Sequence, residues 1–137
     1  MKIFLDTNIL LDLVLRREDE ASAKAIVETA FRGETIRLYA SYLSVANLAY
    51  VIRRQPPEKV RDCVRDIVRW CNILPCNDMQ IIQAGSLSCE DFEDALQIMC
   101  AEEKHCDAII TRNPAHFRCH TEIPVLSPDE FLSHLGR

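Results

Sequence analysis

Short apolar runs alternate with amphipathic stretches along this chain, and that alternation predicts strands and helices in turn. Five runs are predicted as strands: residues 2–5, 36–40, 73–74, 108–111 and 124–126. Strands that alternate with helices favour a parallel sheet covered by helices on both faces. The predicted fold class is therefore α/β, with three α/β/α layers and a mainly parallel central sheet.

The stretches between these runs carry helical periodicity and recognisable ends. Helices are predicted over residues 9–15, 18–31, 43–54, 58–70, 78–87, 88–104 and from 127 onward. Asn8 and Asn77 are the expected N-caps of the first and fifth helices. Gly33 is expected to end the second helix. The "SCED" stretch at 88–91 has the spacing of a capping box.

The composition is that of an ordinary globular chain. Its 137 residues suit one domain, which we expect to span 1–137. No apolar stretch is long enough to cross a membrane. The seven cysteines are an odd number and are scattered, which favours reduced thiols in a cytoplasm over a disulfide framework.

The formal net charge of −5 does not match nucleic acid, but the charge is uneven. Residues 53–69 hold six basic and three acidic side chains, a local excess of three positive charges. Such a patch can steer a polyanion. The same residues also form pairs three apart, as on a solvated helix, so both interpretations stay open.

Polar residues interrupt the apolar stretch "FLDTNILLD" at 4–12, directly after the first predicted strand. A buried carboxylate such as Asp6 is costly unless it has a partner, a metal or a function. Asn113 follows the predicted strand at 108–111. Parallel sheets bind ligands at the carboxyl ends of their strands, so this edge is the expected site.

Two further stretches carry polar residues within apolar helices. Asp91 and Asp94 are three apart in "DFEDALQIM" and share a helix face. Asp91 can be either the acid of a capping box or a site residue. Asn47 is the strongly polar residue within "LSVANLAYVI", where it is either a satisfied core amide or a neutral oxygen ligand.

Four stretches in this order resemble the PIN-domain family, the metal-dependent ribonucleases that include VapC-type toxins: "FLDTNILLD", "SYLSVANLAYVI", "DFEDALQ" and "DAIITRNPAHF". By position, Asp6 corresponds to the family's first acid and Asp94 to its third. Asn113 falls where the family has Asp or Asn. Thr111 and Asn8 fall on its supporting polar positions. The resemblance implies a PIN-like fold, single-stranded RNA as substrate, a homodimer and a small antitoxin.

Asn47 departs from the family pattern, which usually has Glu in that position. An amide keeps one oxygen donor but lacks the charge that hard cations prefer. A subgroup of the family is expected to share this Asn. The alternative function is an RNA- or protein-binding module without strong catalytic activity.

The expected cofactor is Mg²⁺ or Mn²⁺, which suits a cluster of oxygen ligands. The predicted metal ligands are Asp6, Asp94 and Asp91, with Asn47 and Asn113 completing the catalytic group directly or through water. Arg112 is either a phosphate contact or a surface charge. The predicted activity is metal-dependent endoribonuclease cleavage by a toxin.

Other chemistry fits less well. The His and Cys residues between 100 and 120 match no zinc spacing, and ordinary buried thiols and surface imidazoles are expected instead. An aspartyl phosphatase would need an acid where Asn8 stands. Asp107 is expected at the far end of its strand, beyond reach of a metal near Asn113.

Overall fold

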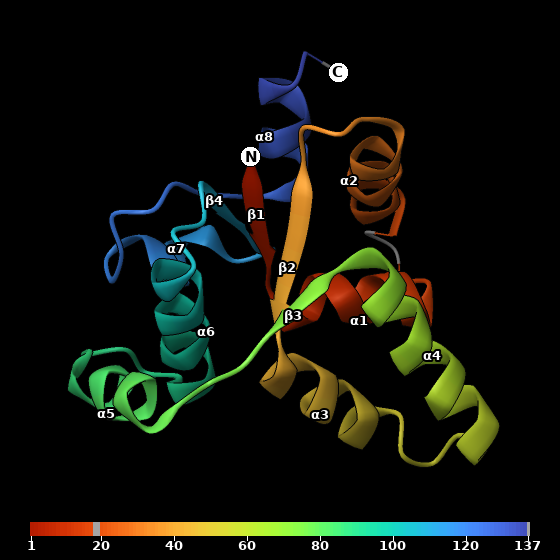
Figure 1. Ribbon diagram of the computed structural model, residues 1–137, viewed down its shortest axis with the longest axis horizontal. Helices are drawn as coiled ribbons and strands as arrows, with labels where there is room; N and C mark the ends of the chain where they lie inside the picture. Colours follow the sequence, from red (N-terminus) through yellow and green to blue (C-terminus); the bar gives the residue numbers. More distant parts are fainter. Residues whose placement is uncertain (18–19, 137) are drawn as a thin grey trace.

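The computed structural model describes residues 1–17 and 20–136, in which helices cover both faces of a parallel sheet (Figure 1). The strands are β1 (Lys2–Leu5), β2 (Arg37–Ser41), β3 (Asn72–Leu74), β4 (Ala108–Ile110) and β5 (Val125–Leu126). The helices are α1 (Thr7–Leu15), α2 (Glu20–Arg32), α3 (Tyr42–Val51), α4 (Pro57–Trp70), α5 (Asp78–Ser86), α6 (Phe92–Glu103), α7 (Pro114–Arg118) and α8 (Pro128–His134). The predicted three-layer α/β fold is confirmed.

The order of the strands places the first one at the centre of the sheet. That order is β3-β2-β1-β4-β5, and every pairing among the described strands is parallel. The chain builds outward from β1 on one side and then crosses to β4 on the other. The gap between the carboxyl ends of β1 and β4 is therefore a topological switch point, where sheets of this kind bind ligands.

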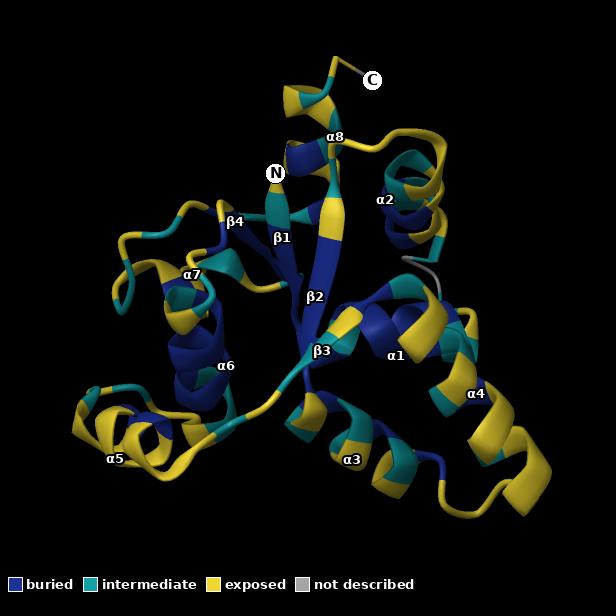
Figure 2. Ribbon diagram, viewed as in Figure 1, coloured by how far each residue is buried: buried dark blue, intermediate teal, exposed yellow. Residues whose placement is uncertain are grey.

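Side chains of each strand alternate between two cores, one on each face of the sheet. Phe4 and Ile109 point to the face that α5, α6 and α7 cover. Ile3, Leu38 and Ile110 point to the face that α1, α2 and α8 cover. The inner strands are buried on both sides (Figure 2). Each such side chain contributes about 1.5–3 kcal/mol of burial free energy, so the central strands are firmly held.

Of the three N-caps predicted for α1, α5 and α6, that of α5 is present and the other two are wrong. Asn77 caps α5 in a capping box, as predicted. Asn8 is not the cap of α1, because the backbone carbonyl of Asp6 already accepts hydrogen bonds and the helix begins two residues earlier than predicted. Ser88 lies before α6, and Asp91 is the N-cap instead, since its side chain accepts from two backbone amides.

The sequence did not predict α7, because this five-residue helix begins at the proline of an Asn-Pro pair, and such a pair is typical of a turn. The α3 helix ends at Val51 rather than at 54. The predicted start of the second helix at residue 18 lies outside the described residues.

None of the helices in the described ranges combines the length and apolar character that a membrane crossing requires.

The basic stretch lies largely on α4, whose outer face is exposed (Figure 2). Two of the expected pairs form there, Asp62 with Arg65 at 3.6 Å and Asp66 with Arg69 at 3.9 Å. These contacts support the interpretation of a solvated helix face. The seven cysteines, all within the described ranges, are free thiols.

Candidate functional site

The switch point brings polar residues from three elements to the carboxyl end of the sheet. Leu5 of β1 is paired with Ile110 of β4, so the residues that follow them, Asp6 and Thr111, are neighbours. The N-terminal turn of α6 carries further carboxylates to the same place. Segments from both ends of the sequence and from its middle therefore form this site.

Asp6 is a buried carboxylate that two side chains hold in place. It is 3% exposed. Its Oδ1 accepts a hydrogen bond from Gln97 Nε2 at 2.9 Å, and its Oδ2 accepts one from the Thr111 hydroxyl at 2.8 Å. Burial raises the pKa of Asp6 above its usual range, while these two hydrogen bonds oppose the rise. The carboxylate is thus oriented, but its negative charge is poorly compensated.

Asp94 lies in the first turn of α6 and is half-buried. Burial raises its pKa to about 7, with smaller contributions from the charges of Asp6, Asp91 and Glu93. Asp91, the N-cap, is exposed, and its Oδ1 accepts from the backbone amides of Glu93 at 2.8 Å and Asp94 at 3.3 Å. Asp91 therefore caps α6 as its N-cap rather than as the acid of a capping box with Ser88, and it still contributes negative charge beside Asp94.

Glu93 is the site residue that sequence reasoning missed. Its Oε1 accepts from the Thr7 hydroxyl at 2.8 Å, and its Oε2 accepts from Asn47 Nδ2 at 2.7 Å. The Thr7 hydroxyl also lies 2.7 Å from the hydroxyl of Ser44 on α3. The signal in the sequence was the spacing of Glu93 and Gln97, which are four apart and share a helix face.

Asn8 and Asn113, two other predicted site residues, lie at the margin of this group, and Asp107 lies away from it as predicted. Asn8 is the second residue of α1 and is only partly buried. Asn113 is exposed at the start of α7, and its backbone amide donates to the Thr111 hydroxyl at 3.2 Å. Asp107 lies at the opposite end of β4, where its Oδ2 accepts from the backbone amide of Lys2 at 2.7 Å. Asp107 is thus a structural residue in a strand-end contact.

Arg112 points to a buried acid on α1. Its Nε lies 3.3 Å from Oδ2 of Asp12, a side chain with no exposed surface. Arg17 approaches the other oxygen of Asp12 at 3.9 Å. The guanidinium thus compensates a buried carboxylate, and a phosphate contact by Arg112 stays a prediction.

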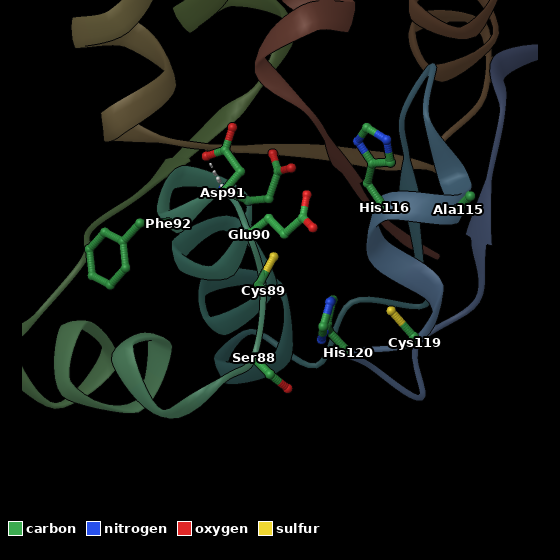
Figure 3. A pocket seen from close by; sticks show the side chains of 10 residues that line it. Ser88, Cys89, Glu90, Asp91, Phe92, Ala115, His116, Cys119 and His120 are labelled. Atoms are coloured by element: carbon green, nitrogen blue, oxygen red, sulfur yellow. Dashed lines mark hydrogen bonds between the residues drawn. The ribbon is translucent and has the colours of Figure 1, made fainter.

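A cavity of about 720 Å³ opens beside the acidic group. Asp91 and Asp94 line it, together with residues of α7 and of the segment that leads into α6. Figure 3 shows Asp91 on that segment, across the cavity from His116 and His120. The cavity is large enough for a nucleotide-sized group and gives access to Asp94.

A family model described as "PIN domain" matches residues 2–115. The chain belongs to the PIN-domain family. The match includes every predicted site residue, from Asp6 to Asn113, and confirms the family resemblance seen in the sequence. No match was found among curated proteins.

Solved structures show the same PIN-domain fold. VapBC2 from Rickettsia felis, bound to a DNA fragment from their promoter, gives a TM-score of 0.71 at 18% identity, over 93% of this chain and 98% of that chain. VapBC-1 from nontypeable Haemophilus influenzae gives a TM-score of 0.73 at 20% identity, over 94% of this chain and 99% of that chain. A toxin-antitoxin complex from Klebsiella pneumoniae gives a TM-score of 0.67 at 23% identity, over 92% of this chain and 97% of that chain.

The donor chemistry of this PIN domain fits a hard divalent cation. Among the residues that the structure describes, no three His, Cys, Asp or Glu side chains are arranged to hold a metal ion. Asp6, Glu93 and Asp94 nevertheless offer carboxylate oxygens at one sheet edge. Burial is the main cause of the raised pKa of Asp94 and the nearby carboxylates add to it, and a cation at this place would favour the charged form of Asp94.

The raised pKa of Asp94 predicts that the metal-free PIN domain loses stability as the pH rises. Folding favours the protonated acid, so this contribution is lost between pH about 4 and 7, while Asp6, Asp91 and Glu93 add repulsion. We expect a loss of about 1–2 kcal/mol, since solvent screens this half-buried group. Asp94→Asn should flatten the profile in urea unfolding with EDTA at pH 5 and pH 8. Parallel profiles for the two proteins would contradict this prediction.

Proposed function

We propose that this PIN domain is a divalent-metal-dependent endoribonuclease that hydrolyses phosphodiester bonds in single-stranded RNA, as the toxin of a toxin–antitoxin pair. The observation that carries the proposal is the buried Asp6, oriented by Thr111 and Gln97, in electrostatic contact with Asp94 at the topological switch point. A structural role alone does not require like charges to gather at a sheet edge that can bind a ligand.

Asp6 and Asp94 would hold the metal, with Asp91, Asn47 and Asn113 completing the group directly or through water. When bound, Mg²⁺ or Mn²⁺ would supply a water of lowered pKa and would neutralise charge on the phosphate. The chain's own part is to fix the donors. Thr111 and Gln97 prevent Asp6 from turning away, and the backbone of α6 places Asp94 at the mouth of the cavity.

The proposed partners follow from the same family membership. The similar structures are VapBC proteins and a toxin-antitoxin complex, which supports an antitoxin as partner here. Exposed apolar side chains on α3 and α5, among them Tyr42, Tyr50, Met79 and Ile82, offer surfaces for an antitoxin and for a homodimer. We place the protein in the cytoplasm, where its free thiols stay reduced.

The test is cleavage of end-labelled single-stranded RNA by purified protein free of antitoxin. We expect cleavage with Mn²⁺, none with EDTA, and recovery when Mn²⁺ is restored. Asp94→Asn should lose the activity, while Asp107→Asn, the same substitution at the far end of β4, should keep it.

A folded sample that does not cut RNA with Mn²⁺ would contradict the nuclease proposal. It would favour the alternative, an RNA- or protein-binding module, for which the neutral Asn47 and the lack of a preformed metal group among the described residues are the supporting observations. RNA retention on a native gel without cleavage would then identify the binding module.

A further inference from the structure

The carboxylate of Glu93 is held as firmly as that of Asp6, although it lies on a different element. Thr7 and Asn47 each donate one hydrogen bond, and each uses a different oxygen of Glu93. Thr7 comes from α1 and Asn47 from α3, so two helices outside α6 fix this one side chain. The charge of Glu93 acts on both Asp6 and Asp94.

A purely structural role does not explain the charge at this position. The hydroxyl of Thr7 and the amide of Asn47 are neutral donors. A carboxylate beside Asp6 and Asp94 makes their ionisation less favourable, which costs free energy in the metal-free protein. A bound cation turns this repulsion into a favourable interaction, because each negative ligand attracts the cation.

We propose that Glu93 is the third charged ligand position of the metal site, and that Asn47 and Thr7 are positioning residues that aim its carboxylate. This inference rests on the proposed metal-dependent function. In this chain the acid lies on α6 and the amide on α3, and the hydrogen bond between them joins the two helices at the site.

This arrangement makes a specific prediction about exchange of the two residues. Asn47→Glu alone would place a second carboxylate where the amide now donates at 2.7 Å, and the two like charges would repel. The exchange Asn47→Glu with Glu93→Gln restores one acid and one amide. The donor and acceptor are simply reversed, and the number of charges at the site is unchanged.

The experiment measures Mn²⁺ affinity by isothermal titration calorimetry, with melting temperatures recorded in EDTA. Glu93→Gln should weaken Mn²⁺ binding by about tenfold or more without lowering the melting temperature. The exchange variant should recover most of that loss, and Asn47→Glu alone should melt lower in EDTA. Glu103→Gln, the same substitution at the exposed far end of α6, is the matched control and should bind Mn²⁺ as the wild type does.

The outcomes separate this inference from the proposed function. Wild-type affinity in Glu93→Gln, with binding lost in Asp94→Asn, would overturn the role of Glu93 and leave the metal site intact. A wild-type protein that binds no Mn²⁺ would overturn both. If Glu93→Gln does not fold, the exchange variant decides: wild-type-like binding supports the inference, and binding at the level of Asp94→Asn overturns it.

Discussion

Asp6→Asn is expected to reduce RNA cleavage by about 100-fold or more while the protein stays folded. The substitution removes a negative charge and keeps the shape of the side chain. The remaining oxygen can accept from Gln97, and the new amide can donate to the Thr111 hydroxyl, which rotates to accept. The buried position therefore stays satisfied, and loss of activity reports loss of the charge.

The measurement pairs cleavage rates at saturating Mn²⁺ with urea unfolding in EDTA. Because burial already raises the pKa of Asp6, a neutral side chain should leave the free energy of unfolding unchanged or slightly higher. Full activity in Asp6→Asn would contradict the site assignment. A collapse of stability together with activity would instead indicate that Asp6 has a structural role.

Arg112→Ala is expected to lower the free energy of unfolding by about 2–3 kcal/mol. Asp12 has no exposed surface, and the guanidinium of Arg112 lies 3.3 Å from its Oδ2. Removal of Arg112 takes this contact away from a buried carboxylate, while the contact of Arg17 at 3.9 Å remains. A partner lost from a buried charge costs far more free energy than a lost surface contact.

Urea unfolding at pH 7 measures this effect, with Arg65→Ala as the control. Arg65 pairs with Asp62 on the exposed face of α4, where solvent screens the pair, and its removal should change stability little. In the Arg112→Ala background, Asp12→Asn should restore much of the lost free energy of unfolding. If Arg112→Ala is as stable as wild type but binds RNA more weakly, the phosphate-contact interpretation of Arg112 holds instead.

The sequence could predict those structural features, such as strands and helix caps, that depend on residues close together in the chain. β1 and β4 are short apolar runs that end at polar residues, and Asn77 has its capping partner three positions on. These signals located the sheet and the edge at which Asp6 lies. The fold class followed from them, and the family followed from the resemblance of four stretches to PIN domains.

The remaining site residues depend on contacts between distant segments, which a local pattern does not encode. The sequence pattern assigns no role to Glu93, and its contacts are visible only once Thr7 and Asn47 lie against it. Arg112 and Asp12 are one hundred positions apart, and the fold alone brings them together. The sequence pattern predicts Asn8 as the cap of α1, because a backbone carbonyl such as that of Asp6 carries no sequence signature.

The central position of β1 also has a consequence for biosynthesis. β1 pairs with β4, so the middle of the sheet joins residues 2–5 to residues 108–110. Strand pairings between residues so far apart in the sequence form late in folding. During synthesis, the N-terminal residues also leave the ribosome long before the residues with which they pair. The Asp6 carboxylate therefore lacks its hydrogen bond from Thr111 until that residue has been synthesised and has left the ribosome. A growing chain that has not yet exposed Thr111 lacks the completed site, so the proposed nuclease would be inactive until that segment has left the ribosome.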